Sequence, residues 1–291
     1  MTLTGVFVPL ITPFTDSGEL ALPALERLAH TVLDAGATGL VALGTTGEPS
    51  SLSPGEQRAV MDLVSRICRE RSAVLIAGAN TVAAAAALPA GVTAALSVVP
   101  AFVRPGEDGV VAHFTALAAG SPVPLVVYHV PYRTGQPLSA NAIRRIAGVA
   151  GVIGLKYSAA GIDAETVDLM ADPPRGLAIL GGDDPFISPL LALGAHGGIL
   201  ASAHLETARF VELVNAWHSG DLAHARALGH RLARLSAALF AEPNPTVIKA
   251  ALQAQGRIPS SLVRLPLLPA GPHSVRAAAT LVQGGTATLA A

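Results

Sequence analysis

Two lysines are the first candidates for chemistry, because the chain has 19 cationic residues and the other 17 are arginines. Lys156 ends the apolar run 152–155, so a strand there would carry its amine into a buried site. Burial favours the neutral amine, which adds to a carbonyl and expels water to form an imine. The alternative is a lysine that extends to the rim with its charge in water. Lys249 lies in the amphipathic pattern 247–252, where we expect a solvated or structural role.

Hydroxyl groups follow a second apolar run, at 38–43. The run 44–48 reads Gly-Thr-Thr-Gly-Glu and places Thr45 and Thr46 between two glycines. Hydroxyl and backbone N–H donors in such a loop can bind a carboxylate, and glycines allow a close approach. An ordinary glycine turn is the alternative.

A tyrosine and an arginine accompany the apolar run at 125–128. Tyr128 ends this run, where its phenol can transfer a proton or simply pack in a core. Arg133 follows five residues later and can hold a carboxylate in its planar fork, or form a surface ion pair.

Other polar residues near the ends of apolar runs have structural interpretations. Asp184 precedes Pro185, so we predict that it caps the following helix. His129, His196 and His204 match no familiar metal-ligand spacing. We therefore expect no metal and no cofactor.

The elements that must position these residues alternate along the chain. The predicted strands are residues 6–11, 38–43, 73–77, 94–99, 125–128, 152–156, 177–180 and 197–200. The predicted helices between them are 22–35, 54–70, 81–88, 109–119, 140–146, 163–170 and 184–193, followed by 206–218, 222–240 and 245–255. This alternation favours a (β/α)8 TIM barrel, with the chemistry at the C-terminal ends of the strands. We expect a catalytic barrel at 1–220 and a C-terminal helical region at 221–291. An open doubly wound sheet is the alternative, but no Gly-x-Gly-x-x-Gly turn follows the first strand.

Composition excludes several classes of partner. A net charge of −1 in 291 residues leaves no basic excess for nucleic acid. Cys68 is the single cysteine, so no intramolecular disulfide is possible and a reducing cytoplasm fits best. No apolar run is long enough to span a membrane. Only 13% of residues are charged, which predicts apolar surface to cover and hence a homo-oligomer.

The motifs together resemble the dihydrodipicolinate synthase/N-acetylneuraminate lyase family across essentially the whole chain. The likeness rests on the run 44–48, on 128–135 (Tyr-His-Val-Pro-Tyr-Arg-Thr-Gly) and on 154–156 (Gly-Leu-Lys), in this order and spacing. Gly-Asp-Asp at 182–184 and Asn-Pro-Thr-Val-Ile-Lys at 244–249 also look like family segments.

The resemblance implies a role for each candidate. Lys156 forms an imine with pyruvate, Tyr128 shuttles protons, and Thr45 and Thr46 bind the pyruvate carboxylate or relay protons. Gly47 and Ile199 are further substrate contacts by this likeness. An enamine then adds to an aldehyde, or the reverse reaction cleaves a longer 2-oxo acid. Members of the family usually form tetramers built from dimers.

The chain also departs from the family pattern. Phe102 stands where a tyrosine usually enters the neighbouring subunit's proton relay, and it has no hydroxyl. His129 replaces the usual asparagine, and the helix at 81–88 is shorter than in typical members. Feedback inhibition by lysine is not expected, because Ala101 lacks an aromatic ring and 51–57 contains no histidine.

Several activities, which differ in the second substrate, remain open. Arg133 matches the arginine that binds aspartate semialdehyde in the synthase branch, which favours 4-hydroxy-tetrahydrodipicolinate synthesis. The alternatives are an aldolase for 2-keto-3-deoxy sugar acids, N-acetylneuraminate or 4-hydroxy-2-oxoglutarate, and a dehydratase or deaminase that uses the same imine at Lys156. A keto-acid-binding module with little turnover is a different class, and Phe102 supports it.

Overall fold

Eight parallel strands form a closed barrel in the computed structural model, which describes residues 2–283. They are β1 (Gly5–Pro9), β2 (Gly39–Ala42), β3 (Val74–Gly78), β4 (Ala94–Val98), β5 (Leu125–His129), β6 (Val152–Tyr157), β7 (Ala178–Gly181) and β8 (Gly197–Ile199). β1 closes the barrel by pairing with β8, with Gly5 opposite Gly197. The predicted (β/α)8 class is thereby confirmed, and the open sheet is excluded.

The barrel interior is a packed core and not a channel. Side chains that point inward form one cluster, which includes Phe7, Val41, Ile76, Val126 and Leu180. A second cluster fills the layer between the strands and the surrounding helices. The strands are therefore buried on both faces, which explains why their sequences read as continuous apolar runs.

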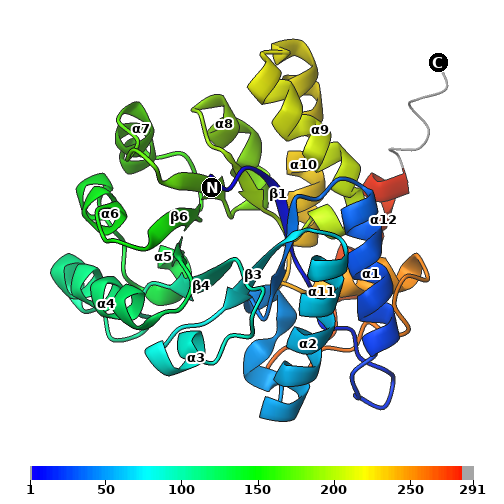
Figure 1. Ribbon diagram of the computed structural model, residues 1–291. Helices are drawn as coiled ribbons and strands as arrows, with labels where there is room; N and C mark the ends of the chain where they lie inside the picture. Colours follow the sequence, from blue (N-terminus) through cyan, green and yellow to red (C-terminus); the bar gives the residue numbers. More distant parts are fainter. Residues whose placement is uncertain (1, 284–291) are drawn as a thin grey trace.

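Helices surround the strands (Figure 1). Those of the barrel are α1 (Leu22–Asp34), α2 (Pro54–Glu70), α3 (Val82–Ala86), α4 (Gly106–Gly120), α6 (Ala140–Ala147), α7 (Ala164–Ala171), α8 (Ile187–Ala192) and α9 (Ala203–Ser219). Local signals set several of these ends. Ser53 and Glu56 form a capping box at the start of α2, for example. The helix predicted at 184–193 is instead the 3-10 turn η3 (Asp184–Phe186) followed by α8.

The predicted helix at 81–88 shortens to the five residues of α3. Thr81 caps it by accepting a hydrogen bond from the N–H of Ala84. Only Ala85 of this helix is buried. An alanine-rich segment favours helix locally but offers little apolar surface to hold it against the barrel, and Pro89 follows closely.

Three further helices follow the barrel: α10 (Leu222–Leu239), α11 (Thr246–Ala254) and α12 (Pro272–Gln283). In Figure 1, α9 to α12 gather on the side of the barrel where α1 lies, and α10 packs against α8, α9, α12 and η3. α12, which follows a proline-rich segment, has no counterpart among the helices predicted from the sequence. Residues 284–291 of the proposed 221–291 region lie outside the described residues. Within residues 2–283, no helix is both long and apolar enough to cross a membrane.

Candidate active site

Lys156 and Tyr128 lie side by side on neighbouring strands. Lys156 belongs to β6 and Tyr128 to β5, and the two residues are partners in the strand register. The Lys156 Nζ atom lies 4.1 Å from the centre of the Tyr128 ring. Both residues are near the C-terminal ends of their strands, where barrel enzymes carry their chemistry. A phenol and an amine thus share one end of the barrel.

The Lys156 amine is buried, with 6% of the residue exposed. Burial lowers the pKa of Lys156, an effect that the nearby Asp184 carboxylate opposes. Among residues 2–283, no carboxylate lies within 4.0 Å of the amine to form an ion pair. The alternative of a lysine that extends to the rim is therefore wrong, and burial raises the fraction of neutral, nucleophilic amine above that of an exposed lysine.

Gly182, directly after β7, makes room for this lysine. A Cβ atom at Gly182 would come within 2.7 Å of the Lys156 Cε atom and 2.3 Å of the Ser158 Oγ atom. No larger residue fits there without moving the lysine. The glycine of the Gly-Asp-Asp run therefore serves a close approach between strands β6 and β7.

The two threonines follow β2 in a 3-10 turn, η1 (Thr45–Gly47). Thr46 is buried, and its Oγ1 atom accepts a hydrogen bond from Asn244 Nδ2 at 2.9 Å. Thr45 is exposed to the cavity at the barrel end. Gly47 lies deeper: its carbonyl accepts a hydrogen bond from Thr12 Oγ1 at 2.7 Å.

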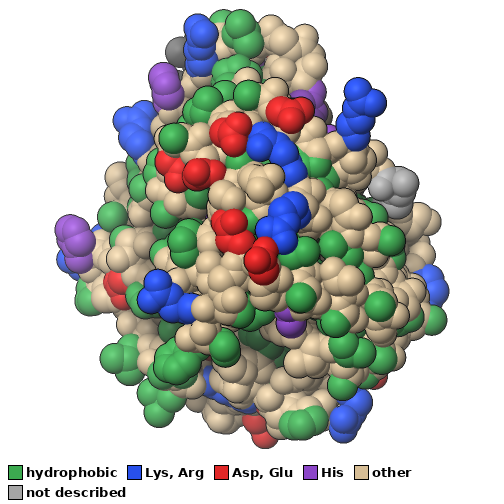
Figure 2. Space-filling model, turned by 90° about the vertical axis from the view of Figure 1, so that its left-hand side faces the viewer, with side chains coloured by type: hydrophobic (Ala, Val, Ile, Leu, Met, Phe, Trp, Pro, Cys, Tyr) green, Lys and Arg blue, Asp and Glu red, His purple; other side chains and the backbone are tan. Residues whose placement is uncertain are grey.

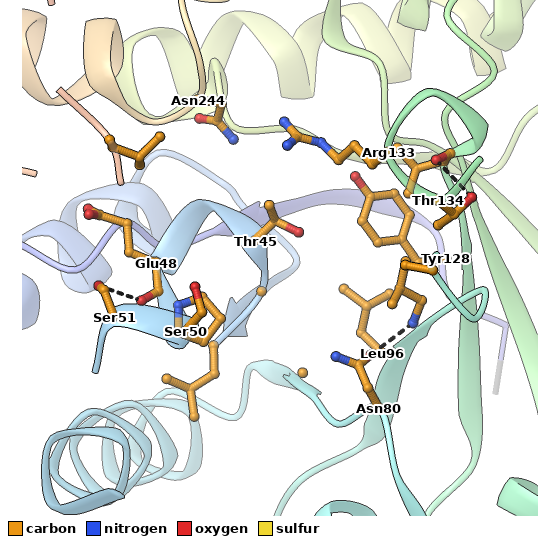
Figure 3. Close-up of a pocket in the computed structure, with 18 of the residues that line it drawn as sticks. Thr45, Glu48, Ser50, Ser51, Asn80, Leu96, Tyr128, Arg133, Thr134 and Asn244 are labelled. Carbon is orange, nitrogen blue, oxygen red and sulfur yellow. Dashed lines mark hydrogen bonds between the residues drawn. The ribbon is translucent and has the colours of Figure 1, made fainter. Parts of the chain in front are cut away.

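One cavity brings most of the predicted site residues together. Its lining is Pro9, Thr45, Thr46, Tyr128, Tyr132, Arg133, Lys156, Gly182, Asp184, Ile199, Ala201, Phe240 and Asn244. Gly47 is the one predicted contact that does not line it. The cavity continues past Thr45, Tyr128, Arg133 and Asn244 into a wider pocket, and Figure 3 shows these four side chains around that space.

Arg133 lies on the short helix α5 (Pro131–Thr134), which the sequence reasoning did not predict. Its Nε atom donates to Tyr132 Oη at 3.3 Å. Within the described part of the chain it has no carboxylate partner, so the surface ion pair is not formed. The guanidinium is free to bind a carboxylate that enters the cavity.

The predicted helix cap at Asp184 is wrong. Asp184 Oδ2 accepts a hydrogen bond from the N–H of Ser202, which follows β8, at 2.5 Å. The cap fails because η3 begins at Asp184 itself and turns the carboxylate inward. Burial raises the pKa of Asp184, and its Oδ1 atom has no hydrogen-bond partner among the described residues. Asp184 is therefore a cavity residue that the sequence reasoning misassigned.

Two of the three histidines near the strand ends are enclosed within the fold. His129 and His204 are buried, and burial lowers the pKa of each to about 4. His204 Nε2 accepts a hydrogen bond from the N–H of Ile11 at 3.2 Å. Within residues 2–283, no group of three or more His, Cys, Asp or Glu side chains is arranged to hold a metal ion.

Lys249 is not solvated, contrary to one of the two roles expected for it. It is fully buried and forms an ion pair with Glu48. The amphipathic pattern around it indicated a helix correctly, as α11, but a pattern cannot show that the partner carboxylate comes from another part of the chain.

Comparison with known proteins agrees with this geometry. The sequence model of the dihydrodipicolinate synthetase family matches residues 2–283. The chain belongs to this family. The 4-hydroxy-tetrahydrodipicolinate synthase of Methanothrix thermoacetophila is 36% identical over 272 residues, which cover 91% of each chain. The enzyme of the same name from Sorangium cellulosum is 39% identical over 280 residues, covering 93% of this chain and 92% of the relative.

A solved structure of a family member extends the comparison to three dimensions. The chloride-inhibited dihydrodipicolinate synthase of Acinetobacter baumannii, complexed with pyruvate, superposes with a TM-score of 0.90 at 31% identity. The match covers 97% of this chain and 99% of that one. In the present chain, Phe102 stands where the resemblance implied a tyrosine; it is 96% exposed in the single chain and does not line the Lys156 cavity.

Proposed function

We propose that this chain is a pyruvate-dependent lyase that acts through a Schiff base at Lys156. The proposed reaction is 4-hydroxy-tetrahydrodipicolinate synthesis, in which pyruvate condenses with aspartate semialdehyde. The observation that carries the proposal is the buried Lys156 amine, which faces the Tyr128 ring at 4.1 Å in a cavity lined by two threonine side chains. The names of the relatives support the same reaction.

Each step then has a residue to perform it. The neutral Lys156 amine attacks C2 of pyruvate, and loss of water leaves an iminium ion. Thr45 and Thr46 bind the pyruvate carboxylate, while Ile199 contacts the substrate from β8. Tyr128 moves protons to and from the reacting atoms. Loss of a proton from the methyl group gives an enamine, which forms the new carbon–carbon bond with the aldehyde and regenerates the iminium. The amino group of aspartate semialdehyde then adds to C2 and displaces the Lys156 amine, which closes the ring and frees the lysine.

The second substrate enters beside Arg133. This residue lines the Lys156 cavity and both adjoining pockets, and it has no carboxylate partner in residues 2–283. A guanidinium in this position would bind the carboxylate of an acidic aldehyde. Gly47 supports the site indirectly, through the backbone of η1.

A hydroxylated aldehyde is the second candidate, and one observation favours it. The pocket beyond Arg133 is also lined by three acidic residues, Asp183, Asp184 and Glu242. Carboxylates accept hydrogen bonds from hydroxyl groups, as an aldolase for sugar acids would require.

A turnover assay distinguishes the two candidate reactions. Pyruvate is supplied with aspartate semialdehyde or with neutral hydroxylated aldehydes, and carbon–carbon bond formation is measured for each. Preference for aspartate semialdehyde supports the synthase. If pyruvate methyl protons exchange with heavy water but no condensation occurs, the chain forms the enamine without joining it to any of these aldehydes. No exchange would support a keto-acid-binding module.

We further propose a homo-oligomer. Phe102 and Val103 are 96% and 77% exposed, and Leu265 and Leu268 are 77% and 68% exposed. Large exposed apolar residues that adjoin one another, as Phe102 and Val103 do in the sequence, can mark a surface that a partner covers. Figure 2 shows apolar side chains scattered over one face, with charged groups both above and below its centre. Light scattering during size-exclusion chromatography would test the proposal, and a monomeric mass would contradict it.

A further inference from the structure

The second lysine is as deeply buried as any side chain in the protein. Lys249 has 0% exposure, and its Nζ atom donates to Glu48 Oε1 at 2.5 Å and to the Leu262 carbonyl at 2.9 Å. The amine also lies 4.1 Å from the centre of the Phe14 ring. Lys249 lines none of the cavities described above, so it does not contact a substrate in them.

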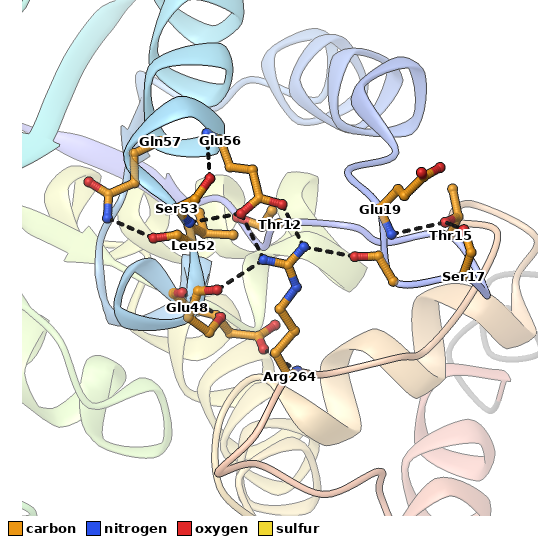
Figure 4. A network of polar contacts seen from close by, with 12 residues as sticks. Thr12, Thr15, Ser17, Glu19, Glu48, Leu52, Ser53, Glu56, Gln57 and Arg264 are labelled. Carbon is orange, nitrogen blue, oxygen red and sulfur yellow. Dashed lines mark hydrogen bonds and ion pairs between the residues drawn. The ribbon is translucent and has the colours of Figure 1, made fainter.

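Its partner, the Glu48 carboxylate, is held on both oxygens. Lys249 donates to Oε1, and the backbone N–H of Arg264 donates to Oε2 at 3.0 Å. The Arg264 guanidinium is fixed in turn by Glu56 on α2, at 2.6 Å (Figure 4). Glu48 is therefore clamped by residues more than 200 positions away in the sequence.

Glu48 also ends the loop that carries the two threonines. Each of three successive residues in this loop has its own anchor. Asn244 donates to Thr46, Thr12 donates to the Gly47 carbonyl, and Lys249 donates to Glu48. Glu48 adopts the left-handed conformation, with φ 53° and ψ 41°. This conformation is unfavourable for a residue with a side chain, so the loop needs outside contacts to keep it.

We propose that Lys249 is a positioning residue, whose ion pair with Glu48 holds Thr45 and Thr46 in the geometry that binds the substrate carboxylate. The inference rests on the proposed function, because that function gives the threonines their role. It assigns the C-terminal region a part in substrate binding, beyond packing on the barrel.

Removing the Lys249 amine leaves Glu48 as a buried carboxylate without its cation. Such a group either binds a proton or moves toward water, and both changes release the end of the loop. Small displacements of groups that orient a substrate can lower reactivity by about 100-fold, so we expect a measurable loss of pyruvate binding.

Two measurements on Lys249→Met test the inference. The first is hydrogen exchange of the amides of Gly47 and Glu48 in the loop and of Ser51 and Leu52 directly after it, all of which bond within residues 44–52. The second is the pyruvate concentration that gives half-maximal borohydride trapping at Lys156. We expect exchange in this loop to be about tenfold faster, and half-saturation about tenfold higher, with exchange in the barrel strands unchanged.

The double variant Glu48→Gln/Lys249→Met distinguishes positioning from stability alone. It removes both buried charges, so thermal stability should recover toward that of the wild type. A positioning role predicts that half-saturation by pyruvate stays several-fold higher than in the wild type. Arg231→Met is the matched control, because it removes the α10 partner of Glu206 without touching the loop.

The outcomes are distinct from those of the proposed function. Wild-type exchange in the loop of Lys249→Met would overturn the inference, and so would full recovery of pyruvate half-saturation in the double variant. If the wild type forms no pyruvate adduct, the proposed function fails, and the exchange measurement alone then decides whether Lys249 holds the loop.

Discussion

The side-chain amide of Asn244 donates a hydrogen bond to the Thr46 hydroxyl at 2.9 Å, across 198 residues of sequence. The contact joins the segment before α11 to the turn after β2. Because Asn244 lines the same cavity as Lys156, the amide also helps to shape the space beside the amine.

Replacement of Asn244 by alanine should weaken pyruvate binding. Thr46 would lose the donor that orients its hydroxyl, and one hydrogen bond contributes about 1 kcal/mol, or roughly fivefold in affinity. Pyruvate titration followed by borohydride trapping measures the effect. Gln136→Ala is the control, because its amide bonds to Gly106 and Pro137 outside the cavity. Equal pyruvate affinity of the wild type and Asn244→Ala would show that this contact does not support pyruvate binding.

Tyr128→Phe should slow turnover more than it weakens pyruvate binding, because it removes only the hydroxyl. We expect kcat to fall about 100-fold, as for loss of a proton-transfer group, with a small change in KM. Steady-state kinetics on pyruvate tests this. Tyr157→Phe is the matched control: its hydroxyl bonds to Thr166, and the residue does not line the Lys156 cavity. A KM effect without a kcat effect would argue against proton transfer by Tyr128.

Arg133→Ala should lower kcat/KM for acidic aldehydes by about 10- to 100-fold, because a charge-assisted hydrogen bond contributes about 1.5–3 kcal/mol. Neutral aldehydes should lose little. Arg145→Ala, which removes an exposed ion pair with Asp108, is the control. Parallel losses for acidic and neutral aldehydes would indicate that Arg133 shapes the pocket without binding a carboxylate.

Stability should fall in mild acid because of two buried histidines. Burial lowers the pKa of His129 and His204 to about 4 in the fold, against about 6.5 in an unfolded chain. Well above pH 6.5 both are neutral in either state. Between pH 6.5 and 4 the unfolded chain binds protons that the fold does not, so stability decreases as pH falls.

By pH 5 the loss is about 2 kcal/mol for each histidine. Urea unfolding at pH 7 and pH 5 measures the difference. His129→Phe should reduce the difference by about 2 kcal/mol, because this ring packs beside Tyr157 and its Nδ1 atom has no partner among the described residues. The exposed His273→Phe is the control. An unchanged difference in His129→Phe would contradict this origin.

The barrel could be predicted because its signals are local. Strands buried on both faces have sequences that read as short apolar runs between glycines and prolines. In β6, Lys156 directly follows such a run. The cavity residues Lys156, Tyr128, Thr45 and Thr46 follow from this pattern, since the C-terminal ends of barrel strands converge.

The residues that were missed or misassigned depend on contacts between distant segments. Asp184 pairs with the N–H of Ser202 and not with its own helix, and Lys249 pairs with Glu48. Helical periodicity and capping rules describe a residue's neighbours in sequence, so they gave Asp184 a cap and Lys249 a possible place in water. No local signal reports that a turn after β2 meets the segment after α10.

Imine formation at Lys156 is tested by mass spectrometry of the protein after incubation with pyruvate and borohydride, which reduces an imine to a stable amine. We expect one pyruvate-derived adduct, located on Lys156 and absent in Lys156→Ala, while Lys249 stays unmodified. An adduct on another residue, or no adduct under conditions that trap a known family member, would contradict the central claim.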